Sequence, residues 1–202
     1  MHGRIIVFAR EPIAGCTKTR LHPALGPEGA AALSRKLIRH TLDKASAARA
    51  DEVVLYASDP VDKGFLAECA MHYGIPLRTQ AGSDLGQRMN QAFQHELATA
   101  DWVVLVGTDC PSMLPEDIEQ AESALREGCD AVIGPALDGG YYLLGLRRCN
   151  PSLFTGIEWG TEAVYTQTKN VLDGLGFGVL ELPARRDIDT PDDLAFLPAQ
   201  WA

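Results

Sequence analysis

Short apolar segments alternate with longer segments of helical periodicity along the chain. This alternation predicts an α/β domain. Several of the short segments contain almost no polar residue, as expected for strands that helices cover on both faces. The predicted strands are Arg4–Ala9, Glu52–Ala57, Pro76–Thr79, Trp102–Gly107, Asp130–Pro135, Tyr141–Leu146 and Phe177–Leu182.

The predicted helices are Pro27–Ala48, Asp62–Tyr73, Gly86–Ala98, Pro115–Glu127 and Thr161–Leu175, with a last one that begins near Pro191. Pro27, Pro115 and Pro191 each suit a first helical turn, where the missing amide hydrogen costs nothing. The residues ALDGG between two predicted strands are too few for a crossover helix, so the sheet is expected to be mixed. We therefore expect a Rossmann-like three-layer α/β/α sandwich with a mostly parallel sheet, formed by residues 1–202 as a single domain.

Composition narrows the function classes. The 202 residues are 46% hydrophobic, which is ample for a core, and the formal net charge of −9 argues against generic binding to nucleic acid or anionic membranes. No apolar stretch approaches the length of a membrane span or a signal peptide, so a soluble cytoplasmic protein is expected. The five cysteines have no paired spacing and the five histidines form no cluster, which indicates reduced thiols and no histidine-based metal site.

The loop REPIAGCTKTRL follows the first strand and carries three cations, Arg10, Lys18 and Arg20. It matches neither the P-loop nor the G-x-G-x-x-G motif. Gly15 allows a turn in which backbone amides approach an anion, while lysine supplies a point charge and arginine a fork for phosphate oxygens. The loop therefore indicates a phosphate site, with a merely solvated cationic loop as the alternative.

Two acidic motifs follow other strands. In VGTDCPSM, Asp109 lies just past an apolar strand, where a carboxylate can hold a hard cation such as Mg²⁺ or cap the next helix. In ARRDIDTPDDL, Asp187 and Asp189 alternate and point the same way if the chain is extended. Either aspartate is a candidate to complete a cation site begun by Asp109, although Asp189 also suits a helix cap.

Two further loops combine glycine with polar residues: QAGSDLGQRMNQAF, with Gln80, Asp84 and Arg88, and GPALDGGYYLLGL, with Asp138. Gly86 reads as a helix start whose free amides suit a phosphate or carboxylate. Hairpin turn chemistry by itself also explains the DGG sequence.

The motifs FAREPIAGCTKTRL, DLGQRMNQAF, GTDCPSM, DGGYYLLGL, GIEWGT and DIDTPDDL, in this order, resemble the nucleotide-diphospho-sugar transferase superfamily. Within it they are more similar still to a bacterial branch whose members are labelled glycosyltransferase or protein of unknown function. The resemblance runs from Arg4 to Leu194 and implies the GT-A fold. The superfamily contains sugar-nucleotide pyrophosphorylases, molybdenum-cofactor nucleotidyltransferases and glycosyltransferases. The segment AGCTKTRLHPAL is especially similar to the opening of phospholactate guanylyltransferases.

The resemblance implies roles for individual residues. Gly15, Lys18 and Arg20 match the positions that hold nucleotide phosphates, and Gln80 and Gly82 match the position that reads the base. The metal, Mg²⁺ or Mn²⁺, is implied at Asp109 and Asp189, with Asp187 as a possible partner. The other substrate-binding candidates are Ala9, Arg10, Asp84, Gly86, Arg88, Asp138 and Gly140, with Glu158 and Trp159 expected on the acceptor side.

Three functions fit this pattern. The first is a metal-dependent nucleotidyltransferase that uses a nucleoside triphosphate and a small phosphorylated or anionic acceptor, with Lys18, Arg20 and Asp109 as catalytic residues. The second is a glycosyltransferase with a nucleotide-sugar donor, which the incomplete D-x-D signature in TDC disfavours. The third is a non-catalytic nucleotide-binding module. The C-terminal segment AFLPAQWA is expected to dock on the domain itself or on a second subunit, which would make a homodimer.

Overall fold

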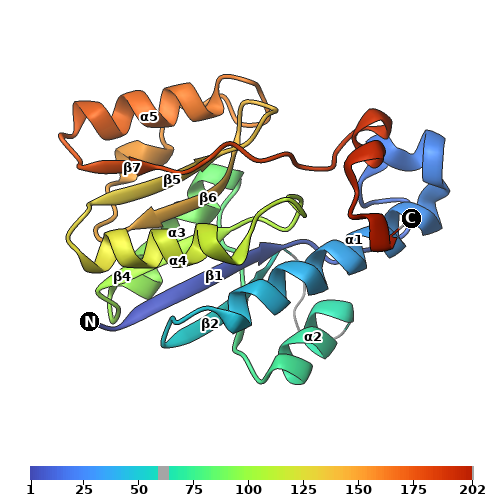
Figure 1. Ribbon diagram of the computed structural model, residues 1–202, viewed down its shortest axis with the longest axis horizontal. Helices are drawn as coiled ribbons and strands as arrows, with labels where there is room; N and C mark the ends of the chain where they lie inside the picture. The colour runs from blue at the N-terminus through green and yellow to red at the C-terminus, as the bar shows by residue number, and fades with distance from the viewer. Residues whose placement is uncertain (59–63, 202) are drawn as a thin grey trace.

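The computed structural model describes residues 1–58 and 64–201, and these form a seven-stranded mixed sheet between two layers of helices (Figure 1). The order across the sheet is β3-β2-β1-β4-β6-β5-β7. Strand β6 runs antiparallel to both of its neighbours, and the other pairs are parallel. The strands are β1 (Gly3–Ala9), β2 (Glu52–Ala57), β3 (Leu77–Thr79), β4 (Trp102–Val106), β5 (Ala131–Pro135), β6 (Tyr141–Leu146) and β7 (Val179–Glu181).

The structure confirms the mixed α/β sandwich and contains every predicted strand. The central strands are buried on both faces because their side chains alternate between two helix layers: in β1, Ile5 and Val7 face one layer and Ile6 and Phe8 face the other. The edge strand β7 is shorter than predicted because it pairs only with three residues of β5.

Helices α1 (His22–Ala47), α2 (Phe65–Tyr73) and α4 (Pro115–Arg126) cover one face of the sheet, and α3 (Leu85–Leu97) and α5 (Val164–Gly174) cover the other (Figure 1). Helix α1 is interrupted at Gly26, whose φ of 68° is not helical, so the regular helix begins at Pro27 as predicted. The predicted start of the second helix, at Asp62, lies outside the described residues.

The last predicted helix differs in type from the prediction. Residues Pro191–Phe196 form a 3₁₀ helix rather than an α-helix, and Leu197 is already extended (φ −60°, ψ 147°). Leu197 precedes Pro198, and the proline ring disfavours helical backbone in the residue before it, so the element stops early. Three more 3₁₀ turns lie at Thr19–Leu21, Pro151–Phe154 and Ala199–Trp201.

The C-terminal segment docks on α1, which is the first of the two alternatives predicted for it (Figure 1). Ile188, fully buried, packs against Leu21 and Leu37, and Leu197 and Trp201 pack on the same cluster. The Trp201 ring meets the ring of His40 edge-on, with centroids 5.0 Å apart. The last segment of the chain is therefore fixed beside the cationic loop that follows β1.

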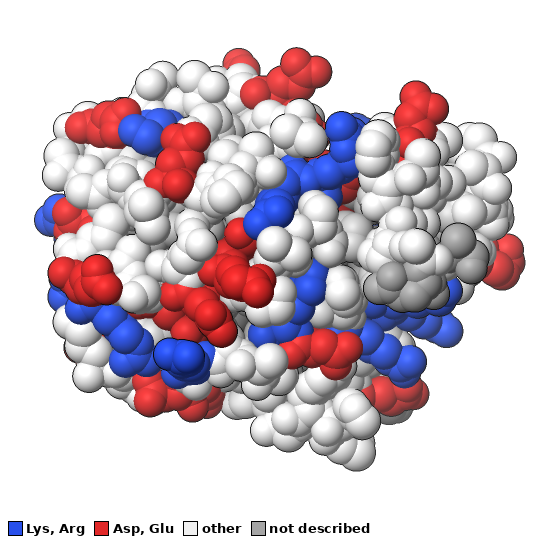
Figure 2. Space-filling view, viewed as in Figure 1, with Lys and Arg blue, Asp and Glu red and all other residues white. Residues whose placement is uncertain are grey.

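Acidic and basic side chains are interspersed over the face shown in Figure 2, and basic groups gather along the middle of the molecule beside acidic ones. Within residues 1–58 and 64–201, every helix is too short or too polar to cross a membrane.

Candidate active site

A cavity of about 1210 Å³ opens at the carboxyl ends of the parallel strands, where α/β sheets commonly bind ligands. Ala9 and Arg10 line it at the end of β1, and Thr108 and Asp109 line it just after β4. Because β6 is antiparallel, the turn before it, which carries Asp138, reaches the same edge. Segments that are far apart in the sequence therefore meet in one site.

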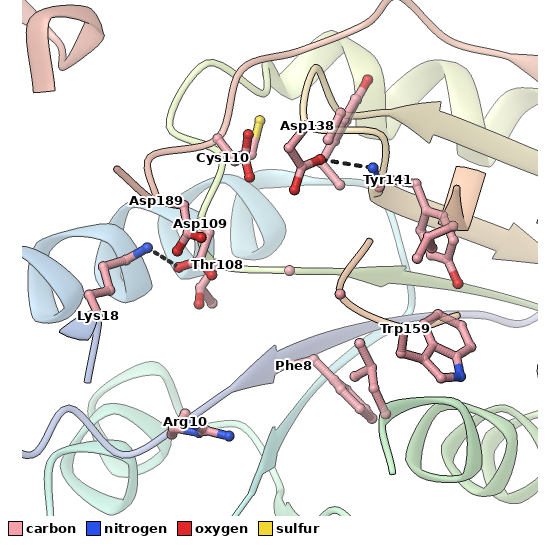
Figure 3. Close-up of a pocket in the computed structure, with 18 of the residues that line it drawn as sticks. Phe8, Arg10, Lys18, Thr108, Asp109, Cys110, Asp138, Tyr141, Trp159 and Asp189 are labelled. Carbon is pink, nitrogen blue, oxygen red and sulfur yellow. Dashed lines mark hydrogen bonds and ion pairs between the residues drawn. The ribbon is translucent and has the colours of Figure 1, made fainter. Parts of the chain in front are cut away.

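Lys18 contacts Asp109 in this cavity (Figure 3). The Lys18 Nζ lies 2.8 Å from Asp109 Oδ1 and donates a hydrogen bond of 2.5 Å to the carbonyl oxygen of Ile188. The lysine side chain is only 5% exposed, whereas that of Asp109 is 57% exposed. Among the residues that the structure describes, Lys18 is the one non-glycine residue with a positive φ (45°), a left-handed conformation that is uncommon for side-chain-bearing residues.

Arg20 makes a second ion pair at the cavity. Its Nη1 lies 2.5 Å from Asp189 Oδ2, and both side chains are exposed. The backbone amide of Ile188 donates a 2.8 Å hydrogen bond to the carbonyl of Asp109, so the two aspartates are held on adjacent segments. Figure 3 shows Asp109 and Asp189 side by side, with Lys18 directed at Asp109. Two of the three cations of the loop, Lys18 and Arg20, are thus each paired with one candidate metal carboxylate.

The segment that carries Asp187 and Asp189 is tied firmly to the loop after β4. Arg185 makes a two-pronged ion pair with the buried Asp117, at 2.8 and 2.9 Å. The Ser112 hydroxyl donates to the Arg186 carbonyl and accepts from its amide, at 2.8 and 2.9 Å. This bracing fixes the position of the segment that carries Asp187 and Asp189 relative to the loop that carries Asp109.

Lys44, on α1, holds the loop after β4 by hydrogen bonds to its backbone. Its Nζ donates hydrogen bonds to the carbonyl oxygens of Pro111, at 3.0 Å, and Met113. Burial lowers the pKa of Lys44. Burial also raises the pKa of the neighbouring Cys110 thiol, whose Sγ lies 3.4 Å from the Arg186 carbonyl, so Cys110 is a packing residue rather than a thiolate nucleophile.

Asp187 has the most perturbed carboxyl in the cavity. Burial raises its pKa to about 7, and the neighbouring charges of Asp138 and Asp189 act in the same direction. A carboxyl in such surroundings is protonated well above its ordinary range, because a second negative charge nearby disfavours ionisation. Burial and the neighbouring carboxylates therefore favour the protonated form of Asp187.

The chemistry of these carboxylates fits a hard divalent cation. Mg²⁺ and Mn²⁺ prefer oxygen ligands, which Asp109 and Asp189 offer on adjacent segments. Within the described ranges, no group of three His, Cys, Asp or Glu side chains lies in an arrangement that would hold a metal ion.

The loop after β3 and the first turn of α3 contain three predicted site residues with structural roles, all of which line the cavity. Gln80 donates its amide hydrogens to the carbonyl oxygens of Ala9 (3.1 Å) and Tyr56 (2.9 Å), so it links the ends of β1 and β2. Asp84 is the N-cap of α3, accepting a 2.8 Å bond from the Gln87 amide. Arg88 donates from Nε to the Gly82 carbonyl at 3.1 Å, which leaves its two Nη groups for a ligand.

Three predicted glycines are not among the residues that line the cavity: Gly15, Gly82 and Gly86. Gly86 is covered by Trp159, because a Cβ atom added there would lie 2.6 Å from the indole Nε1. Gly140 does line the cavity, and its amide donates to Asp138 at 2.8 Å. The binding roles inferred for these glycines stay predictions.

Aromatic side chains line one side of the cavity, and most of them were not predicted as site residues from the sequence. Phe8 and Tyr141 line the cavity together with Trp159, which was expected on the acceptor side, and Figure 3 shows these rings across from Lys18. The sequence signal that could have identified these two residues was their position, because Phe8 lies near the end of β1 and Tyr141 begins β6. Arg10 is exposed and lies apart from the ion pair of Lys18 in Figure 3.

Residues 41–161 match the family model for an uncharacterized protein conserved in bacteria, DUF2064, over more than half of the chain. The chain belongs to the DUF2064 family. The matched region of this DUF2064 protein contains Asp109 and Asp138 but neither Lys18 nor Asp189.

A curated relative and a solved structure extend the comparison over nearly the whole DUF2064 chain. The chain is 31% identical over 183 residues to a phosphoenolpyruvate guanylyltransferase of Streptosporangium roseum, covering 88% of this chain and 77% of the relative. It is 34% identical to a protein of Desulfovibrio desulfuricans G20 assigned as a nucleotide-diphospho-sugar transferase, with a TM-score of 0.89, covering 99% of this chain and 88% of that one. These similarities confirm the superfamily expected from the motifs.

A more distant structure shares the fold alone. It is the glucosyl-3-phosphoglycerate synthase of Mycobacterium tuberculosis in complex with Mn²⁺, uridine diphosphate and glucosyl-3-phosphoglycerate, at 14% identity and a TM-score of 0.59, covering 96% of this chain and 75% of that one. The similar proteins are thus nucleotidyl- and glycosyltransferases, and a fold neighbour carries a divalent metal. The DUF2064 chain is a transferase of this superfamily.

Proposed function

We propose that this protein is a divalent-metal-dependent nucleotidyltransferase that uses a nucleoside triphosphate and a small phosphorylated or otherwise anionic acceptor. The observation that carries the proposal is the pairing of Lys18 with Asp109 and of Arg20 with Asp189 at the carboxyl edge of the sheet. Two cations suit a triphosphate, and two carboxylates suit its metal. The guanylyltransferase relative supports the same reaction class and makes GTP the first donor to test.

Each group has a defined task in this reaction. Lys18 and Arg20 bind the phosphates, while Asp109 and Asp189, with Asp187 as a possible partner, hold Mg²⁺ or Mn²⁺. When bound, the metal neutralises phosphate charge. An anionic acceptor oxygen attacks the α-phosphorus, so that a new O–P bond forms as the bond from the α-phosphorus to the bridging oxygen breaks.

Pyrophosphate leaves with the bonding electron pair, and Lys18 and Arg20 stabilise its growing negative charge. The acceptor oxygen carries no proton, so the reaction requires neither a general base nor a covalent protein nucleophile. Positioning and charge neutralisation account for the rate. The protein therefore needs firmly placed charges, which the bracing by Arg185 and Ser112 supplies.

The remaining candidates bind the base and the acceptor in this proposal. Gln80 offers its carbonyl oxygen to the base, because its amide hydrogens already serve Ala9 and Tyr56. Arg88 offers its Nη groups to an anionic portion of substrate. Asp138, Gly140 and the Trp159 ring face the acceptor; the other substrate-binding candidates proposed are Ala9, Arg10, Gly15, Gly82, Asp84 and Gly86.

Glycosyl transfer is the second candidate, and the similarity to the Desulfovibrio protein favours it. The same cations would then stabilise a nucleoside diphosphate leaving group while an acceptor hydroxyl attacks the anomeric carbon. A thermal-shift comparison of triphosphates with nucleotide-sugars, each with Mg²⁺, separates the two reactions, because a ligand of the folded state raises its unfolding midpoint. Binding without any product would instead indicate a non-catalytic nucleotide-binding module.

The decisive test is Asp109→Ala, assayed by pyrophosphate release from GTP with phosphoenolpyruvate as the first acceptor, because the curated relative uses it by name. We expect turnover to fall at least about 100-fold, because the variant lacks a metal carboxylate. The fold should persist, since the Asp109 side chain is 57% exposed. Asp192→Ala, an exposed carboxylate outside the ion pairs, is the control. Near-normal turnover of Asp109→Ala would refute the assignment.

A further inference from the structure

Two of the three candidate metal carboxylates, Asp109 and Asp189, already have cationic partners. Lys18 Nζ lies 2.8 Å from Asp109 and Arg20 Nη1 lies 2.5 Å from Asp189. The same two cations are the groups proposed to bind phosphate. The four charges are therefore paired with one another, and a metal ion at the paired carboxylate oxygens or a phosphate at the paired cations must compete with a partner that is already in place.

We propose that the site takes up its divalent cation preferentially as the metal–triphosphate complex and discriminates against the bare ion, with Lys18 as the residue that enforces this preference. The inference rests on the proposed function, since it assumes that Asp109 and Asp189 are metal ligands. Binding is then an exchange of ionic partners: the carboxylates pass from Lys18 and Arg20 to the metal, and the two cations pass to the phosphates.

The charges explain why each half of the ligand binds poorly alone. A bare metal ion must compete with the Lys18 ammonium for Asp109 and then lies close to a cation that has lost its partner. A bare triphosphate must draw Lys18 and Arg20 away and brings its own negative charge beside two unpaired carboxylates. The complete metal–triphosphate offers each released charge an opposite charge, so metal and nucleotide bind with positive coupling.

The surroundings of Lys18 suit this exchange. Its side chain is 5% exposed and is also held by the carbonyl oxygen of Ile188, so the ammonium keeps one partner when it leaves Asp109. The Asp109 carboxylate, in contrast, is 57% exposed and accessible to an incoming ion. Arg20 is 69% exposed, and water screens its pair with Asp189. Lys18 therefore contributes more than Arg20 to the discrimination against the bare metal ion.

The test is Lys18→Met, with Mn²⁺ alone as the probe and its free concentration followed by electron paramagnetic resonance. We expect the variant to bind bare Mn²⁺ about tenfold more tightly than the unchanged protein, because the competing ammonium is gone. Its affinity for the Mn²⁺–GTP complex, measured by calorimetry, should fall about tenfold or more, because a phosphate partner is lost. These opposite changes are what a purely structural lysine would not produce.

Lys169→Met is the matched control. It removes the same charge from an ion pair, with Asp173, that lies within α5 and away from the cavity. Its Mn²⁺ affinity should remain that of the unchanged protein. Arg20→Met is the second variant, and its 69% exposure favours a native fold. It should tighten bare Mn²⁺ binding by about threefold, because its ion pair is screened.

The outcomes separate this inference from the proposed function. Mn²⁺ binding that is lost in Asp109→Asn but unchanged or weaker in Lys18→Met and Arg20→Met would overturn the exchange and leave the metal site standing. Mn²⁺ binding unaffected by Asp109→Asn would overturn both. Tighter bare Mn²⁺ binding together with weaker Mn²⁺–GTP binding in Lys18→Met would establish the exchange.

Discussion

Replacing Asp187 by asparagine should stabilise the protein at alkaline pH. Burial raises the pKa of the Asp187 carboxyl to about 7 in the folded state, from an ordinary value of 3.8. The folded protein then binds more protons than the unfolded chain between these pH values, so its stability falls as pH rises from about 4 to 7. Asparagine keeps the shape of the side chain and carries no charge, so this loss disappears in the variant.

The size of the effect follows from the shift. A pKa change from 3.8 to about 7 corresponds to a loss of about 4 kcal/mol in the free energy of unfolding when solvent screening is left out. Asp187 is only half-buried, and its charge is shared with the Asp138 site, so solvent screening reduces the expected gain at pH 8 to about 1–2 kcal/mol. For a chain of this length that is roughly 2–8 °C in unfolding midpoint.

The assay is urea or thermal unfolding at pH 4 and pH 8 with EDTA present, so that no divalent ion compensates the carboxylates. The variant and the unchanged protein should have similar stability at pH 4, where Asp187 is protonated, and should diverge at pH 8. Asp192→Asn, an exposed carboxylate in the same segment, should show no gain at pH 8. An Asp187→Asn variant no more stable than the unchanged protein at pH 8 would refute the reasoning.

Two further predictions concern packing around the cavity. Ile188→Ala should lower the free energy of unfolding by about 2–4 kcal/mol, because this side chain is fully buried, whereas Ile13→Ala, at a 53% exposed position, should have little effect in the same urea titration. Gly86→Ala should lower stability by about 1–2 kcal/mol and shift the fluorescence of Trp159, because the added Cβ would lie 2.6 Å from the indole nitrogen. Gly174→Ala, with no atom in the way, is its control; an equal effect of both alanines would contradict the packing argument.

The strands and long helices were predictable because their apolar periodicity is a local property of the sequence. The antiparallel strand β6 was also predictable, since ALDGG leaves no room for a crossover helix. The position of β6 between β4 and β5 was not, because strand order depends on contacts between distant segments. The 3₁₀ form of Pro191–Phe196 was missed, although Pro198 supplied a local signal.

The candidate site, like the fold, was predictable from the sequence only in part. Lys18 and Asp109 were predicted because they lie in loops that follow strands, and Asp189 because it alternates with Asp187 in an acidic motif; the structure places all three at one cavity, and their roles stay predictions. Their pairing was not predictable, because it depends on the docking of residues 185–189 beside the loop after β4. The hydrogen bonds of Gln80 to the ends of β1 and β2 were not predictable either, because they join distant segments; its role in base recognition stays a prediction.

The docking of Ile188 has a consequence for how the protein is made. Translation proceeds from the N-terminus, so Lys18 and Asp109 are synthesised well before Ile188 supplies the amide that holds the Asp109 carbonyl and the carbonyl that holds Lys18. A nascent chain can assemble most of the sheet while the contacts of Lys18 and Asp109 are still incomplete. The arrangement of Lys18 and Asp109 in the folded protein is therefore completed only after Ile188 has been synthesised.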